Sequence, residues 1–63
     1  MNIAMLCAYS GLSTEALADK AGIDRNHLKA IRAGRATMTA DDLLGLSDAT
    51  GIDIRAIETK NQK

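Results

Sequence analysis

The chain has 63 residues, a length that holds one small domain and buries only about 60% of the surface that its unfolded form exposes. Tyr9 is the single aromatic residue and no proline is present, so Leu, Ile, Met and Ala must supply the core, a composition that favours helices over sheets. One cysteine, Cys7, excludes an internal disulfide framework and a cysteine-based zinc site, and the formal net charge of zero argues at first against a polyanionic partner.

The charges are nevertheless segregated along the chain. Residues 20–35 carry five basic residues against one acidic residue, and residues 36–59 carry five acidic residues against one basic residue. The zero sum therefore hides a basic segment followed by an acidic one. The basic residues of the first segment are Lys20, Arg25, Lys29, Arg32 and Arg35.

The first twelve residues, MNIAMLCAYSGL, are uncharged and largely apolar. They lack the basic residues that precede a signal-peptide core and are too short to span a bilayer, so we expect a buried helix at residues 2–10. A domain this small cannot bury an apolar helix on every side, and we expect part of this one to face another subunit. The residues concerned are Ile3, Met5, Leu6, Cys7 and Tyr9, of which Cys7 is interpreted as a core filler.

Four helix starts share one pattern: a hydrophobic residue, a capping residue, and a second hydrophobic residue four places after the cap. In such a hydrophobic staple the cap accepts hydrogen bonds from free N–H groups of the first turn, and the apolar pair fixes the angle at which the chain enters the helix. The instances are Leu12-Ser13 with Leu17, Ile23-Asp24 with Leu28, Met38-Thr39 with Leu43, and Ile52-Asp53 with Ile57.

Glycine stands where each of the first four helices should end, since it adopts the left-handed conformation of a C-terminal cap without steric cost. These glycines are Gly11, Gly22, Gly34 and Gly51. Starts and stops together predict an all-α fold of five helices, at about residues 2–10, 14–21, 25–33, 40–49 and 54–60. We expect residues 1–63 to form a single domain with a frayed tail at residues 60–63.

The corner between the second and third predicted helices contains Gly22, Ile23 and Asp24. Gly22 ends the second helix, Ile23 enters the core, and Asp24 caps the third helix. Two short helices joined by such a turn form a helix-turn-helix. The apolar and small residues that fit this motif are Leu17, Ala18, Ala21, Gly22, Ile23, Leu28 and Ile31, and the flanking stretches are SGLSTEALADKAGI and LLGLSDATGIDIRAI.

In these residues the chain resembles the phage repressor and Cro-type (XRE-like) family of helix-turn-helix DNA-binding domains. The resemblance covers nearly the whole chain. It implies a compact five-helix lambda-repressor-like domain with the helix-turn-helix at helices two and three, and it implies that the second helix of this pair lies in the major groove of DNA.

The third predicted helix has a polar and basic outer face. At about 100° per residue, Leu28 and Ile31 define its inward side, which leaves Asn26, Lys29, Ala30 and Ala33 outward and Arg25 and His27 on the flanks. Asparagine can pair with an adenine edge, arginine or lysine with guanine, and an alanine methyl can lie against a thymine methyl. The resemblance places base-reading residues on this face, and the candidates are Arg25, Asn26, His27, Lys29 and Ala30, with His27 alternatively reaching only a phosphate.

Phosphate contacts are expected at both ends of the helix pair. Thr14, in the first turn of the second predicted helix, offers a hydroxyl and an N-terminal N–H to a phosphate. After the third helix, a loop that by resemblance runs along the DNA backbone supplies Ala33, Gly34, Arg35 and Thr37. Arg32 is interpreted as a partner of an acidic residue, so it ranks below Arg35 as a candidate for a phosphate contact. Lys20 is interpreted as a solvated lysine.

Two surfaces are candidates for a dimer contact. The resemblance points to the region of the fifth helix, where the chain offers Ile52, Ile54 and Ile57. The uncharged first helix is the other candidate, and the sequence does not choose between them.

The leading functional interpretation is a sequence-specific transcriptional repressor that binds a pseudo-palindromic operator as a homodimer, with half-sites about 10 bp apart. The alternative is a protein-interaction module, such as an antitoxin that uses the apolar first helix or the acidic C-terminal half. We expect the protein in the cytoplasm of a bacterial or phage-infected cell, associated with the nucleoid.

An enzyme is not expected, because one His and one Cys on different helices cannot assemble a nucleophile, a base and an orienting residue. Asp41 and Asp42 are interpreted as first-turn carboxylates favoured by the helix dipole. We expect no cofactor, no metal, no membrane and no small-molecule ligand.

Overall fold

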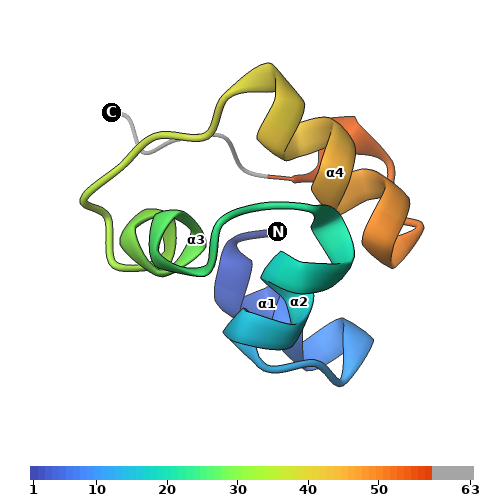
Figure 1. The fold of residues 1–63 in the computed structure, drawn as a ribbon. Helices are drawn as coiled ribbons and strands as arrows, with labels where there is room; N and C mark the ends of the chain where they lie inside the picture. Colours follow the sequence, from blue (N-terminus) through green and yellow to red (C-terminus); the bar gives the residue numbers. More distant parts are fainter. Residues whose placement is uncertain (58–63) are drawn as a thin grey trace.

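The computed structural model describes residues 1–57, which form four α-helices and one short 3-10 helix and contain no strand (Figure 1). The all-α class is confirmed over these residues, and the four α-helices begin and end within two residues of the predicted bounds. The elements are α1 (Ile3–Ser10), α2 (Thr14–Ala21), α3 (Arg25–Arg32), α4 (Ala40–Thr50) and η1 (Ile54–Ala56).

The count of five helices is not confirmed. Where the fifth helix was predicted, the chain makes only the 3-10 turn η1, and Ile57 after it is extended, with φ −90° and ψ 127°. Two β-branched residues, Ile54 and Ile57, frame this turn, and branching at Cβ lowers helix propensity. The rest of the predicted fifth helix and the predicted tail at residues 60–63 lie outside the described residues.

All four predicted caps are confirmed, because each cap side chain accepts a hydrogen bond from a backbone N–H two or three residues later. Each cap satisfies a donor that the first turn would leave without a partner. The caps are Ser13, Asp24, Thr39 and Asp53. A fifth cap, Asn2, was not predicted; its side chain accepts a hydrogen bond from the N–H of Met5 and starts α1.

The predicted stops are also confirmed. Gly11, Gly22 and Gly51 are left-handed C-caps of α1, α2 and α4. Helix α3 ends one residue earlier, at the C-cap Ala33, and Gly34 then adopts the left-handed conformation.

Helix α2 contacts α1, α3 and α4, and the core forms around it. In Figure 1 it lies between α1 and α4, with α3 beside it. Each α-helix contributes one fully buried leucine, and burying a leucine side chain contributes about 2 kcal/mol. These leucines are Leu6, Leu17, Leu28 and Leu46.

The expectation of a buried first helix holds for one side of α1 only. Ile3, Leu6 and Cys7 are in the core, whereas Met5 is 50% exposed and Tyr9 67% exposed. The part of α1 that can face another molecule therefore reduces to the side that carries Met5 and Tyr9. Within residues 1–57, no helix is long and apolar enough to cross a membrane.

Helices α2 and α4 pack closely at Gly45. A Cβ atom built on Gly45 would lie 2.4 Å from the backbone oxygen of Ala21, the last residue of α2. The missing side chain at Gly45 lets α4 approach the point where α2 ends and the turn to α3 begins.

Candidate nucleic-acid interface

The turn between α2 and α3 has the geometry that the sequence predicts. Gly22 is left-handed, with φ 73°, and the N–H of Ile23 donates to the carbonyl of Ala18 at 2.8 Å. Asp24 then accepts a hydrogen bond from the N–H of His27 at 3.0 Å, which starts α3. The helix-turn-helix is therefore held by backbone hydrogen bonds and by one cap, and the direction of α3 is fixed relative to α2.

Helix α3 turns Leu28 into the core and leaves a polar side exposed. Ile31 is half-buried and packs against the core. Asn26 and Lys29 are exposed, as predicted for the outward face, and Arg25, which was predicted on its flank, is exposed as well. Within residues 1–57 the side chain of Asn26 makes no hydrogen bond, so its amide is available to a ligand.

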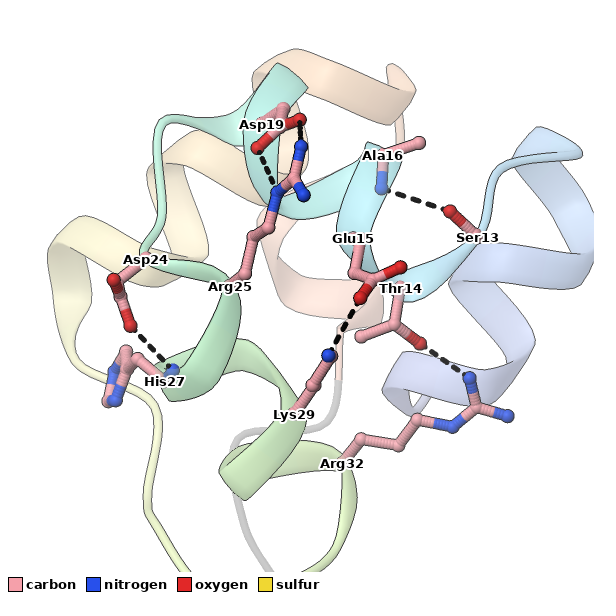
Figure 2. Close-up of polar contacts among 10 residues, drawn as sticks. All are labelled: Ser13, Thr14, Glu15, Ala16, Asp19, Asp24, Arg25, His27, Lys29 and Arg32. Atoms are coloured by element: carbon pink, nitrogen blue, oxygen red, sulfur yellow. Dashed lines mark hydrogen bonds and ion pairs between the residues drawn. The ribbon is translucent and has the colours of Figure 1, made fainter.

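The two cations of this face are paired with acidic residues of α2, which the sequence analysis did not foresee (Figure 2). Arg25 donates from Nε and Nη2 to the two carboxylate oxygens of Asp19, at 2.9 and 2.6 Å. The Nζ atom of Lys29 lies 2.7 Å from Oε2 of Glu15. The hydrogen bond from Arg25 lowers the pKa of Asp19, and that from Lys29 lowers the pKa of Glu15.

Arg32 and Thr14 lie together at the N-terminus of α2 (Figure 2). The Nη1 atom of Arg32 donates to the Thr14 hydroxyl at 2.6 Å. The prediction that Arg32 pairs with an acidic residue is therefore wrong, because a hydroxyl takes that place. This contact brings a guanidinium next to the position where Thr14 was expected to meet a phosphate.

His27 faces α4 and does not share the exposed side of Asn26. Its Nε2 atom lies 2.9 Å from Oδ2 of Asp42, a residue that is only 8% exposed. The same Oδ2 accepts from the N–H of Thr39 at 3.0 Å, which completes a capping box at the start of α4. His27 therefore links α3 to α4.

The buried carboxyl of Asp42 is held in its charged form. Burial alone would raise its pKa, but hydrogen bonds from Thr39 and His27 outweigh burial and lower the pKa below the ordinary value. Asp41, by contrast, is exposed in the first turn of α4. Asp41 and Asp42, which were both predicted to be first-turn carboxylates favoured by the helix dipole, therefore differ in burial and in their partners. The spacing Thr39-x-x-Asp42 was the available signal for a capping box.

The loop after α3 is exposed beside His27. The N–H of Arg35 donates to the carbonyl of Ala30 at 2.8 Å, which ties the loop to the helix. Ala33, Arg35 and Thr37 are all exposed, as expected of residues that meet a DNA backbone. The loop and His27 surround an open depression, which is lined by His27, Gly34, Arg35, Ala36, Thr37 and Thr39.

The three dimer candidates differ in how much surface they offer. Ile57 is 4% exposed and belongs to the core. Ile52 is half-buried and packs against that core, while Ile54 is half-buried in η1.

Residues 1–57 contain no group of three or more His, Cys, Asp or Glu residues that could hold a metal ion.

A tight helix-turn-helix whose second helix has an exposed polar face is typical of small helix-turn-helix DNA-binding domains. The family model of the Cro/C1-type helix-turn-helix DNA-binding domain matches residues 2–59. The chain belongs to this family, which confirms the resemblance found in the sequence and makes the protein a DNA-binding regulator. No curated protein and no solved structure shows a significant match to the chain.

Proposed function

We propose that residues 1–63 act as one domain, a sequence-specific transcriptional repressor that binds a pseudo-palindromic operator as a homodimer. The observation that carries this proposal is the exposed face of α3, where Asn26 stands between Arg25 and Lys29 with its amide free of hydrogen bonds to residues 1–57. A pair of such helices about 10 bp apart reads two half-sites on one side of the duplex. The protein acts in the cytoplasm, at the nucleoid.

Base reading falls to α3. The Asn26 amide pairs with the N6 and N7 groups of an adenine, and Arg25 and Lys29 donate to guanine acceptors. Ala30 lets the helix approach the groove floor and contacts a thymine methyl. Because His27 is bound to Asp42, its part in this proposal is to support the position of α3 and to meet a phosphate at the edge of the groove.

Phosphate contacts hold the domain in register without reading sequence. Thr14 and Arg32 together meet one phosphate at the N-terminus of α2, where free N–H groups also favour an anion. Arg35 and Thr37, with the backbone at Ala33, follow the other side of the groove. Each cation that neutralises a phosphate releases counterions, so affinity falls steeply with salt.

The dimer contact lies at residues 52–57 in this proposal, with the half-buried Ile54 of η1 as its central side chain, while Ile52 and Ile57 pack in or against the core. Sedimentation analysis of Ile54→Asp tests this surface, and Tyr9→Asp on α1 serves as the matched control. We expect Ile54→Asp to give monomers and Tyr9→Asp to leave the dimer intact. The reverse result would move the contact to α1.

A second candidate function is a protein-interaction module such as an antitoxin. The observation that favours it is the exposed apolar side of α1, where Met5 and Tyr9 are 50% and 67% exposed. A surface of this kind can hold a protein partner. Under this alternative DNA binding is weak and secondary.

Selection of bound fragments from a random duplex library tests the proposal, followed by titration of the selected duplex by fluorescence anisotropy at two salt concentrations. We expect a two-fold symmetric site and a steep loss of affinity with salt. If no sequence is enriched and only weak, uniform binding appears at low salt, the proposal fails. The search should then move to a protein partner for α1.

A further inference from the structure

Two carboxylates of α2 face the two cations that the proposed function assigns to base reading. Glu15 and Asp19 are four residues apart and therefore share one side of α2. Arg25 and Lys29 are four residues apart on α3 and meet them in two parallel ion pairs, Asp19 with Arg25 and Glu15 with Lys29 (Figure 2). We call these two pairs the α2–α3 ladder.

The ladder occupies the same donor groups that DNA would need. Arginine recognises guanine with two parallel N–H donors, and a carboxylate accepts from the same kind of fork. Asp19 takes both Nε and Nη2 of Arg25, and Glu15 takes Nζ of Lys29. A DNA acceptor must therefore replace a carboxylate that already fits the cation.

The two pairs are open to solvent and can exchange partners. The side chains of Arg25 and Asp19 are 57% and 53% exposed, and those of Lys29 and Glu15 are 47% and 48% exposed. Exposed ion pairs of this kind are weak, so a well-placed acceptor can displace them. The carboxylates remain beside the interface after displacement, and there they repel the phosphates of any duplex that approaches.

We infer that Glu15 and Asp19 are specificity-determining residues, which restrain Lys29 and Arg25 and so weaken binding to DNA of arbitrary sequence. Every duplex must displace the carboxylates and overcome their repulsion of its phosphates, and only a duplex that adds base contacts in the correct positions gains enough to offset both costs. This inference rests on the proposed function. Two of the eight acidic residues of the chain therefore lie on the proposed binding face itself.

The test uses Glu15→Gln, Asp19→Asn and the double variant, which keep side-chain size and remove the negative charge. Asp48→Asn is the matched control, because it makes the same change of charge at an exposed position of α4 outside the ladder. Affinity is measured by anisotropy for the selected duplex and for a scrambled duplex of equal length, each at two salt concentrations. Circular dichroism checks that each variant is folded.

We expect the double variant to bind the scrambled duplex about tenfold more tightly than the wild type, with a salt slope steeper by about one to two units, because two cations become free to meet phosphates. The ratio of specific to non-specific affinity falls accordingly. Asp48→Asn changes both affinities by less than about twofold, since a charge beyond the contact is screened by salt.

The inference is overturned if the wild type discriminates between the two duplexes and the folded variants keep or lose affinity for the scrambled duplex. It is also overturned if Asp48→Asn raises that affinity as much as the ladder variants do, because net charge alone would then explain the gain. If the wild type binds neither duplex, the proposed function itself fails. These outcomes separate the two claims.

Discussion

Substituting Gly45→Ala tests whether the close contact between α4 and the end of α2 holds the helix-turn-helix in place. The new Cβ would lie 2.4 Å from the backbone oxygen of Ala21, whereas ordinary van der Waals contact begins at 3.4 Å. The two helices must therefore separate by 3.4 − 2.4 = 1.0 Å, or bend locally. The obstructing atom belongs to the backbone, so no side-chain rotation can relieve the contact.

Two opposing terms set the expected effect. Alanine is favoured over glycine in a helix interior by about 1 kcal/mol. Overpacking costs about 1–3 kcal/mol, and a rigid backbone neighbour places this case at the upper end. We therefore expect Gly45→Ala to lose about 1–2 kcal/mol of unfolding free energy, which corresponds to a fall of about 10 °C in Tm for a domain of this size.

Urea denaturation followed by circular dichroism measures this loss. The reverse substitution Ala8→Gly, at an exposed position of α1, is the control for helix propensity alone and should cost about 1 kcal/mol. If Gly45→Ala leaves the protein as stable as the wild type or makes it more stable, helix propensity outweighs the contact. The close packing of α4 on α2 would then not be what positions the corner.

Three further predictions follow from the side-chain contacts. Arg35→Ala should weaken binding to all sequences alike and lower the salt slope by about one unit in anisotropy titrations, and a changed base preference would contradict its assignment to a phosphate. Arg32→Ala should also weaken binding to all sequences and lower the salt slope, because its guanidinium lies beside Thr14 at the N-terminus of α2. An unchanged salt slope would show that Arg32 only supports Thr14. The lowered pKa of Asp42 means that its charged form stabilises the folded state, so its contribution to the unfolding free energy should be constant above about pH 5 and be lost progressively below that pH as the carboxylate takes up a proton. Asp42→Asn should flatten this decline in urea titrations across pH, and an equally steep decline in the variant would place its cause elsewhere.

The sequence predicted the helices and the corner because local signals carry them. A cap such as Asp24 acts within three residues, and a glycine such as Gly22 acts on its own backbone, so neither depends on the rest of the fold. Helix α1 was predicted less well, because its apolar composition does not tell which side finds a partner. The fifth helix is not confirmed for a related reason: Asp53 caps the 3-10 turn η1 just as it would cap an α-helix, and Ile57 after this turn is extended.

The exposed face of α3 was also predictable, since Leu28 fixes the rotation of the helix about its axis. Its side-chain partners were not predictable, because each depends on how two helices are placed in space. The pairing of Lys29 with Glu15 requires the angle between α3 and α2, and the pairing of His27 with Asp42 joins residues fifteen positions apart. Helical spacing could indicate two matching rows of charge, but not that they face each other.

The central claim is that α3 reads bases, and the most direct measurement is to repeat the library selection with Asn26→Ala. Asn26 is exposed, so its truncation should leave the fold intact. We expect the variant to select the same symmetric site with the preference for adenine lost at one position of each half-site, and to bind the wild-type site about 1–3 kcal/mol more weakly. An unchanged selected sequence, bound with unchanged affinity, would contradict the placement of α3 in the major groove.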